Sequence, residues 1–203
     1  MKQIQITVVL LLAFVGIVAV PSGCGRQKAE AKQQLLEVYD VHGSAAKARL
    51  TIDGKEIFTT NAFVGQNGLG KEREGDRKTP LGELHIKGAF GLLPNPGTTM
   101  PYIDVTPSTF SCSDHWEYYN HVIDTAQLHH QCDGEDMFHI APEYNYGLIT
   151  SYNEECIHGL GNSIFVHAKG DSPYTGGCIA LDEERMVDLL TLCDTTLIVR
   201  ITP

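Results

Sequence analysis

The chain alternates short apolar runs with loops rich in glycine and charge, a pattern typical of a protein built mainly from strands. In the stretch 48–64, Leu50 and Ile52 alternate with Thr51, and Asp53-Gly54 supplies a turn, which predicts a β-hairpin. Further short apolar runs predict strands at Glu83–Gly88, Gly147–Tyr152, Ser163–His167, Cys178–Leu181 and Thr196–Ile201.

Helical spacing is confined to two places. Asp182–Leu192 opens on an Asp cap and acidic residues, and then spaces Met186, Leu189 and Leu190 along one face, which predicts a late helix. Residues 25–46 begin as a polar tether, and the apolar end of Arg26–Val38 predicts a short helix there. Short strands with one late helix indicate a mainly β sandwich, with the domain expected at residues 47–203.

Residues 98–145 differ from the rest and are interpreted as an irregular insertion. They hold the single tryptophan, two cysteines and five of the nine histidines, with a short helix expected near Glu135–Ile140. Such a long loop in a compact domain is usually functional. A zinc site at His129, His130 and Cys132 is weighed and not expected, because adjacent histidines converge poorly on one ion and the usual ligand spacings are missing.

The first 24 residues are typical of an export signal. Lys2 is their only charge, and the apolar run Val8–Val20 is too short to span a bilayer. Small residues stand before Cys24, so we expect that cysteine to carry a lipid and to hold the protein on a membrane, facing the periplasm or the cell wall. An uncleaved signal anchor is the alternative.

Composition narrows the partners and the roles of the cysteines. The net charge of −10 disfavours nucleic acid, and we expect a monomer. With Cys24 and Cys178 assigned to other roles, four cysteines remain in an oxidising compartment, which allows three pairings. The pairs expected are Cys112–Cys132 within the insertion and Cys156–Cys193 within the core.

The stretch SIFVHAKGDSPYTGGCIAL carries the candidate chemistry. His167 ends a buried strand, and Cys178 follows a bend made by Thr175, Gly176 and Gly177, where glycine allows close backbone approach. An imidazole that holds a thiol as thiolate, next to free backbone N–H groups, suits nucleophilic attack on an acyl group. An inert buried thiol and a structural histidine are the alternative.

The loop Gly68–Leu84 is a second candidate site. It lacks the ending of a phosphate-binding loop, so no nucleotide is expected. It is either a solvated charge run or a substrate rim, in which Lys71, Arg73 and Lys78 could meet carboxylates; Arg73 and Lys78 are the substrate-binding residues expected.

These residues resemble the L,D-transpeptidase (YkuD-type) catalytic domain of bacterial cell-wall enzymes. The resemblance rests on GNSIFVH, Gly161–His167, on TGGCIAL, Thr175–Leu181, and on EGDRKTPLG, Glu74–Gly82. Tyr119-Asn120 and Tyr152-Asn153 are similar to a branch of the family with an insertion. The chain departs from many members, which carry His in place of Gly176 and Arg or Asn in place of Ala180.

The resemblance implies a β-sandwich with Cys178 as nucleophile, His167 as base, and Thr175 and Gly177 at the small-hydroxyl and oxyanion-loop positions. It also implies an L,D-transpeptidase that cross-links peptidoglycan stem peptides through a cysteine thioester, with no metal or other cofactor. An L,D-carboxypeptidase, an amidase that releases a wall-linked group, and a non-catalytic wall-binding lipoprotein remain alternatives.

Overall fold

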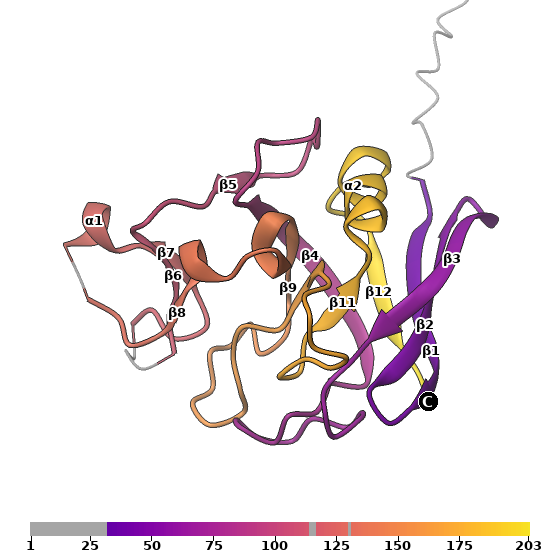
Figure 1. Ribbon diagram of the computed structural model, residues 1–203, viewed down its shortest axis with the longest axis horizontal. Coiled ribbons are helices and arrows are strands. Elements are labelled where there is room, and N and C mark those ends of the chain that lie inside the picture. The colour runs from indigo at the N-terminus through magenta and orange to yellow at the C-terminus, as the bar shows by residue number, and fades with distance from the viewer. Residues whose placement is uncertain (1–31, 114–116, 130) are drawn as a thin grey trace, which may run out of the picture. The chain divides into compact units, whose positions relative to one another are not determined.

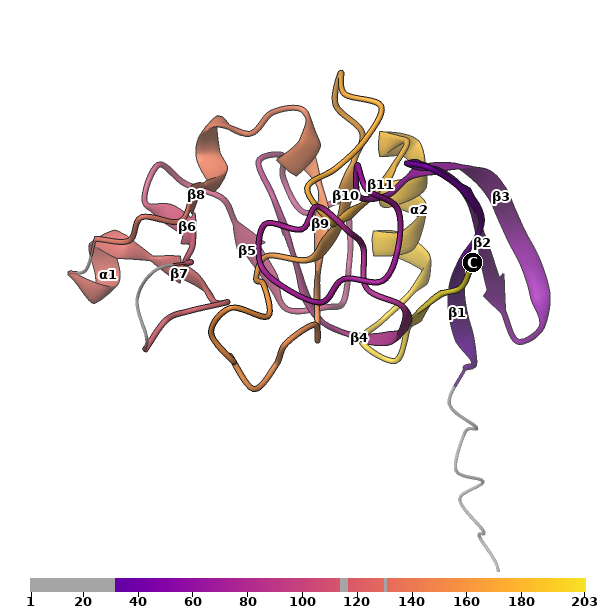
Figure 2. The same ribbon diagram turned by 90° about the horizontal axis from the view of Figure 1, so that it is seen from below.

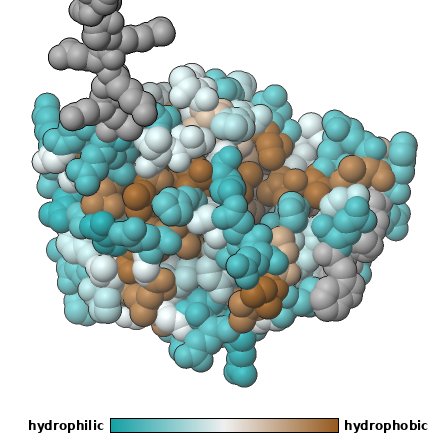
Figure 3. Space-filling view, turned by 180° about the vertical axis from the view of Figure 1, so that it is seen from behind, coloured by the Kyte–Doolittle hydropathy of each residue, from teal (hydrophilic) through white to brown (hydrophobic). Residues whose placement is uncertain are grey.

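We describe the protein from a computed structural model, over residues 32–113, 117–129 and 131–203. The predicted signal and Cys24 lie outside the described residues, as do His115, Trp116 and His130. In the described part, no helix is both long enough and apolar enough to cross a membrane. Over the face drawn in Figure 3, hydrophilic side chains interrupt the apolar ones.

The predicted mainly β architecture is confirmed, and nine of the strands in the described residues form one sheet that closes on itself. The order is β12-β1-β2-β3-β11-β10-β9-β4-β5, and β4 also pairs with β12. The bounds are β1 Gln34–His42, β2 Ala45–Ile52, β3 Lys55–Phe63, β4 Gly82–Gly91, β5 Tyr102–Asp104, β9 Gly147–Thr150, β10 Phe165–Ala168, β11 Ile179–Leu181 and β12 Ile198–Ile201.

The main core fills the inside of this sheet. Alternate residues of the strands point inward, as Leu36 and Val38 of β1 and Val166 of β10 do. The predicted late helix, α2 (Glu183–Leu192), adds Met186 and Leu190 to the same core. Asp182 stands at its N-cap position, but its carboxylate accepts hydrogen bonds from side chains elsewhere and caps no helix N–H.

The prediction of a tether and short helix over residues 25–46 is wrong from Gln34 onward. That segment is β1, which pairs with β2 and with β12, so the domain begins before position 47. The buried residues of β1 alternate with Leu35 and Glu37, a period of two rather than a helical period. Glu37 faces outward and pairs with Arg49 of β2 at 2.7 Å.

The 48–64 hairpin is confirmed as β2 and β3. Asp53 and Gly54 both adopt positive φ, 51° and 74°, as a tight two-residue hairpin turn requires.

The insertion carries its own small sheet, of order β7-β6-β8, at one end of the described domain; β1, β2 and β3 lie at the other end (Figures 1 and 2). The elements are β6 Thr109–Ser111, β7 Val122–Asp124, α1 Thr125–Leu128, β8 Glu135–Asp136 and the 3₁₀ turns η1 Met137–His139 and η2 Glu143–Asn145. The helix expected at Glu135–Ile140 is therefore a strand followed by a single 3₁₀ turn.

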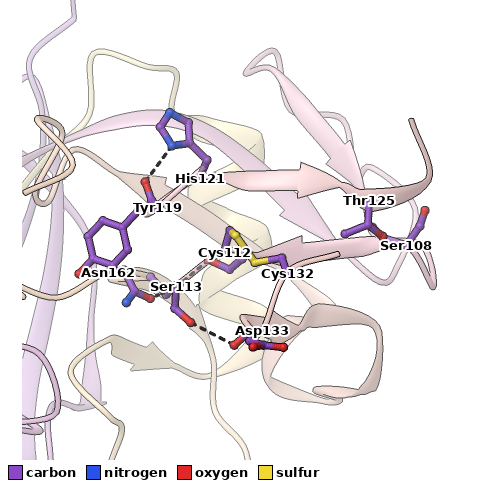
Figure 4. The surroundings of a disulfide bond; sticks show 11 residues. Ser108, Cys112, Ser113, Tyr119, His121, Thr125, Cys132, Asp133 and Asn162 are labelled. Atoms are coloured by element: carbon purple, nitrogen blue, oxygen red, sulfur yellow. Dashed lines mark hydrogen bonds between the residues drawn. A yellow bond between two sulfur atoms is a disulfide. The ribbon is translucent and has the colours of Figure 1, made fainter. Parts of the chain in front are cut away.

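One of the two expected disulfides is confirmed. Cys112 and Cys132 are bonded, with their Cα atoms 5.7 Å apart, and Ser113 donates a hydrogen bond to the Asp133 carbonyl beside them (Figure 4). The Cys156–Cys193 pair is wrong, because both thiols are free. Cys193 is buried in the main core after α2, whereas Cys156 lies in the loop after β9, near His121.

Candidate active site

A cavity of about 340 Å³ opens where β10 and β11 meet the insertion and the loop 68–82. Its walls combine the two predicted catalytic residues with charged groups from three other segments. They include Cys178, His167, Lys71, Glu74, Glu135 and Glu143.

Cys178 and His167 reach this cavity because of strand register. Val166 lies opposite Ile179 in the parallel pair β10–β11, and both point into the main core. Their neighbours must therefore point to the other face, since successive side chains alternate. Phe165 and Cys178 accordingly join a second apolar cluster under the insertion. His167, two residues after Phe165, shares that face and lies diagonally across from Cys178.

The thiol of Cys178 is held by backbone groups. It is 9% exposed, it donates to the Ser163 carbonyl at 3.1 Å, and it accepts from the Phe165 N–H at 3.3 Å. Ser163 has a φ of 56°, an unusual conformation for a non-glycine residue, and this turn brings its carbonyl to the thiol.

The ring of His167 is oriented by the main chain. Its Nδ1 lies 2.7 Å from the Ala168 carbonyl, which can only accept, so Nδ1 carries the proton. In the neutral ring Nε2 therefore keeps its lone pair and can take a proton. Tyr144 packs edge-on against the imidazole, with ring centroids 5.6 Å apart. The Ala168 carbonyl is therefore the group that orients His167, and the sequence alone did not identify it.

Burial favours a neutral resting pair over the thiolate that the sequence predicted. Burial raises the pKa of the Cys178 thiol to about 12, and the charge of Glu135 adds to this; the Phe165 N–H and Lys71 act in the opposite direction. Burial also lowers the pKa of His167. A neutral thiol beside a neutral imidazole can ionise only as it attacks, with proton transfer coupled to bond formation.

Two threonine hydroxyls fix the bend before Cys178. Thr175 Oγ1 donates to the Cys178 carbonyl at 2.7 Å and accepts from the Gly177 N–H at 3.1 Å. Thr79 donates to the Gly177 carbonyl at 2.8 Å and accepts from the Gly65 N–H. The amide of Gly177 is therefore engaged by a hydroxyl and is not free for an oxyanion.

The two glycines of the bend play different roles. Gly177 has a φ of 146°, and a Cβ there would meet the Lys78 carbonyl at 2.9 Å. At Gly176 a Cβ would meet no atom within 4 Å, so this side of the bend is open.

The basic residue in the cavity is Lys71, whereas Arg73 and Lys78, the two expected to bind substrate, line a separate hollow beside the loop. The Lys71 side chain is 4% exposed and its ammonium lies 3.0 Å from the carboxylate of Asp76. A Cβ on Gly177 would lie 3.7 Å from the same ammonium, so this charge stands next to the bend before Cys178.

Asp76 organises the loop that presents Lys71. Its carboxylate accepts from the backbone N–H groups of Glu72, Arg73 and Lys78, at 2.8 to 3.0 Å, besides the ammonium. These hydrogen bonds hold the pKa of Asp76 far below its usual range, against the effect of burial.

A network that sequence reasoning missed joins this loop to the insertion. The Glu74 carboxylate accepts from the Tyr119 hydroxyl at 2.8 Å and from the Asn162 amide at 2.7 Å. Asn120 accepts from the Ser163 N–H and donates to the Tyr152 carbonyl. The Tyr-Asn pairs quoted for the resemblance were the available signal, and their contacts position the residue that holds the thiol.

No group of three or more His, Cys, Asp or Glu side chains within 32–113, 117–129 and 131–203 is arranged to hold a metal ion. In that part of the chain, His121 contacts the Tyr119 carbonyl and His139 contacts Asp136.

Comparison with known protein families supports the resemblance found in the sequence. The family model of the L,D-transpeptidase catalytic domain, YkuD, matches residues 37–201, which covers the closed sheet, the insertion and the cavity. A search of curated proteins found no match. The chain belongs to the family of L,D-transpeptidase catalytic domains.

Proposed function

We propose that the protein is a cysteine acyltransferase that forms L,D cross-links between peptidoglycan stem peptides. The observation that carries this proposal is the placement of Cys178 and His167 on one face of adjacent strands, in one cavity, with Nε2 of the imidazole free to take a proton. The family acts on peptidoglycan, which fits a stem-peptide substrate.

In the first half-reaction, the sulfur of Cys178 attacks the carbonyl of the third stem residue while His167 Nε2 takes the thiol proton. The thiol must turn away from the Ser163 carbonyl to do so. The bond to the terminal D-alanine then breaks, and the imidazolium returns the proton to the departing amine. The product is a thioester on Cys178.

The backbone bend supports the charge that develops on the carbonyl oxygen. Because Thr175 engages the Gly177 amide, we assign the oxyanion to the Cys178 N–H rather than to Gly177. Lys71 binds the carboxylate of the departing D-alanine, since it supplies the ammonium in the cavity. It takes the role expected of Arg73 and Lys78, and of the arginine that many members carry in place of Ala180.

In the second half-reaction, the side-chain amine of another stem attacks the thioester and releases Cys178. Water in place of the amine would make the protein an L,D-carboxypeptidase, and a wall-linked group as leaving group would make it an amidase. The export signal and the lipid on Cys24, both proposals from the sequence, would place the reaction at the cell wall.

Incubation with purified tetrapeptide muropeptides separates these reactions. A cross-linked dimer and free D-alanine support the transferase, whereas tripeptide alone supports the hydrolase. Unchanged stems, with no adduct on Cys178 by mass spectrometry, would favour a non-catalytic wall-binding protein and overturn the proposal. The Cys178→Ser variant is the control for each product.

A further inference from the structure

Glu135 is fixed at the mouth of the cavity by the insertion. It is the first residue of β8, and it lies opposite Ser111 of β6 in the antiparallel register. The preceding Gly134 packs so tightly on the Ser111 carbonyl that no Cβ would fit there. The disulfide ties both strands together just before Glu135, between Cys112 and Cys132 (Figure 4).

The carboxylate of Glu135 is joined to the catalytic histidine through one side chain. The Tyr144 hydroxyl donates to its Oε2 at 2.6 Å, and the same tyrosine packs edge-on against the imidazole of His167. Both residues line the cavity that holds Cys178. Within the described residues, the Tyr144 hydrogen bond engages Oε2 and no donor engages the second oxygen, Oε1.

The surroundings favour proton uptake by this carboxylate. Glu135 is exposed and lines the cavity. The surrounding protein nevertheless raises the pKa of its carboxyl group by desolvation, and the Tyr144 hydrogen bond offsets only part of this. The ionisable groups that share the cavity are Tyr144, Tyr174, Glu143, Glu74, His167, Cys178 and Lys71.

Amine transfer needs a second proton acceptor. A side-chain amine has a pKa of about 10, so near pH 7 only about one molecule in a thousand is neutral and nucleophilic. An ammonium must lose two protons to become an amide nitrogen. His167 can take only one of them, because it delivers that proton to the sulfur released from the thioester.

We propose that Glu135 binds the ammonium of the acceptor stem through its free oxygen and takes the first of these two protons. This rests on the proposed acyl transfer. The carboxylate becomes a carboxylic acid and leaves a neutral amine facing the thioester. The amine attacks, the C–S bond breaks, and its second proton passes through His167 to the sulfur of Cys178. Glu135 then returns its proton to solvent, so one ammonium and one thioester give one amide, one thiol and one released proton.

The assignment makes Glu135 a catalytic residue for the amine half-reaction alone. Attack of the thiol on the donor stem does not use it. The insertion therefore selects an amine over water as acceptor, because an ammonium is attracted to the carboxylate and water is not.

The test compares Glu135→Gln with wild type and with Glu155→Gln, which removes a carboxylate outside the cavity. The donor is a tetrapeptide muropeptide, and intact mass follows the thioester on Cys178. The acceptor is either a lysine-type amine, protonated at pH 7, or hydroxylamine, which is largely neutral there. For Glu135→Gln we expect thioester formation at least as fast as in wild type, because the charge that raises the pKa of the Cys178 thiol is removed. Transfer to the protonated amine should fall at least tenfold, and transfer to hydroxylamine should be retained.

A second variant keeps the inference testable if Glu135→Gln does not fold. Tyr144→Phe removes the hydrogen bond that lowers the pKa of Glu135, so this pKa should rise. The pH below which the rate of amine transfer falls should therefore move upward. Equal losses with both acceptors, or unchanged transfer in both variants, would overturn the role of Glu135 while leaving acyl transfer intact. Failure of the wild type to form a thioester would overturn the proposed function, and this inference with it.

Discussion

The ion pair between Lys71 and Asp76 supports a sharp prediction about stability. Both side chains are more than nine-tenths buried, and Asp76 also receives three backbone hydrogen bonds. In Asp76→Asn, an NH₂ group replaces one oxygen and must face either the Glu72 and Arg73 N–H groups or the ammonium and the Lys78 N–H. The ammonium of Lys71 also loses its counter-charge while it stays buried.

The expected cost is set by the uncompensated charge. Removing one partner of a buried pair typically costs about 3 to 5 kcal/mol, so we expect a loss in this range for Asp76→Asn. Lys71→Met should cost less, about 2 kcal/mol, because the three backbone N–H groups still satisfy the carboxylate. The double variant should lose less free energy of unfolding than the two single variants together, by at least about 1 kcal/mol.

Urea unfolding followed by circular dichroism measures these differences, provided that the free energy of unfolding falls equally steeply with urea concentration in all variants. The pH dependence supplies an independent check. The folded pKa of Asp76 lies below its unfolded value of 3.8, so the stabilisation is complete above about pH 4 and is lost as the pH falls further. The advantage of wild type over Asp76→Asn should shrink in that acid range. A loss below about 1 kcal/mol, or strictly additive losses, would refute the reasoning.

Three further predictions concern the disulfide, the bend before Cys178 and the Cys178 thiol. Replacing Cys112 and Cys132 together by Ser opens a loop whose ends are 20 residues apart, and it should lower the free energy of unfolding by about 3 kcal/mol, measured with urea. As a control, adding reductant to wild type should cause an equal loss. Thr175→Val leaves the buried Gly177 amide without its acceptor and the Cys178 carbonyl with only the longer hydrogen bond from Thr79. Thioester formation should therefore fall at least tenfold while the fold persists; an unchanged rate would contradict the role of Thr175 in the bend. Because burial raises the thiol pKa to about 12, alkylation of Cys178 in the free protein should rise about tenfold per pH unit from pH 6 to 9; a plateau near neutral pH would indicate a resting thiolate.

Local patterns predicted the strands well where alternation and turn residues agree. The Asp53-Gly54 hairpin is an example, and helical spacing likewise predicted α2. At β1 the polar Ala/Gln/Lys/Glu run before Gln34 predicts a helix, and that prediction is wrong. The true signal was the alternation of Leu36 and Val38 with Glu37. Its pairing with β12 joins residues far apart in sequence, which no local pattern reveals.

That Cys178 and His167, the proposed nucleophile and base, share one cavity could be expected from the sequence, because a buried strand ends near His167 and one loop with glycines leads from it to Cys178. The charged groups of the cavity could not. Lys71, Arg73 and Lys78 look equivalent in sequence, and only the hydrogen bonds around Asp76 decide which of them turns inward. Likewise, Glu135 reaches the cavity through strand pairing and a disulfide within the insertion, and both are long-range contacts.

The central claim is that His167 takes the proton of Cys178 during attack, and intact-mass kinetics test it most directly. Wild type and His167→Ala are mixed with tetrapeptide muropeptide near pH 7, and the rate of thioester formation on Cys178 is measured. The account predicts a clear adduct in wild type and a rate at least a hundredfold lower in His167→Ala. Equal rates in the two proteins, or an adduct on a residue other than Cys178, would contradict it.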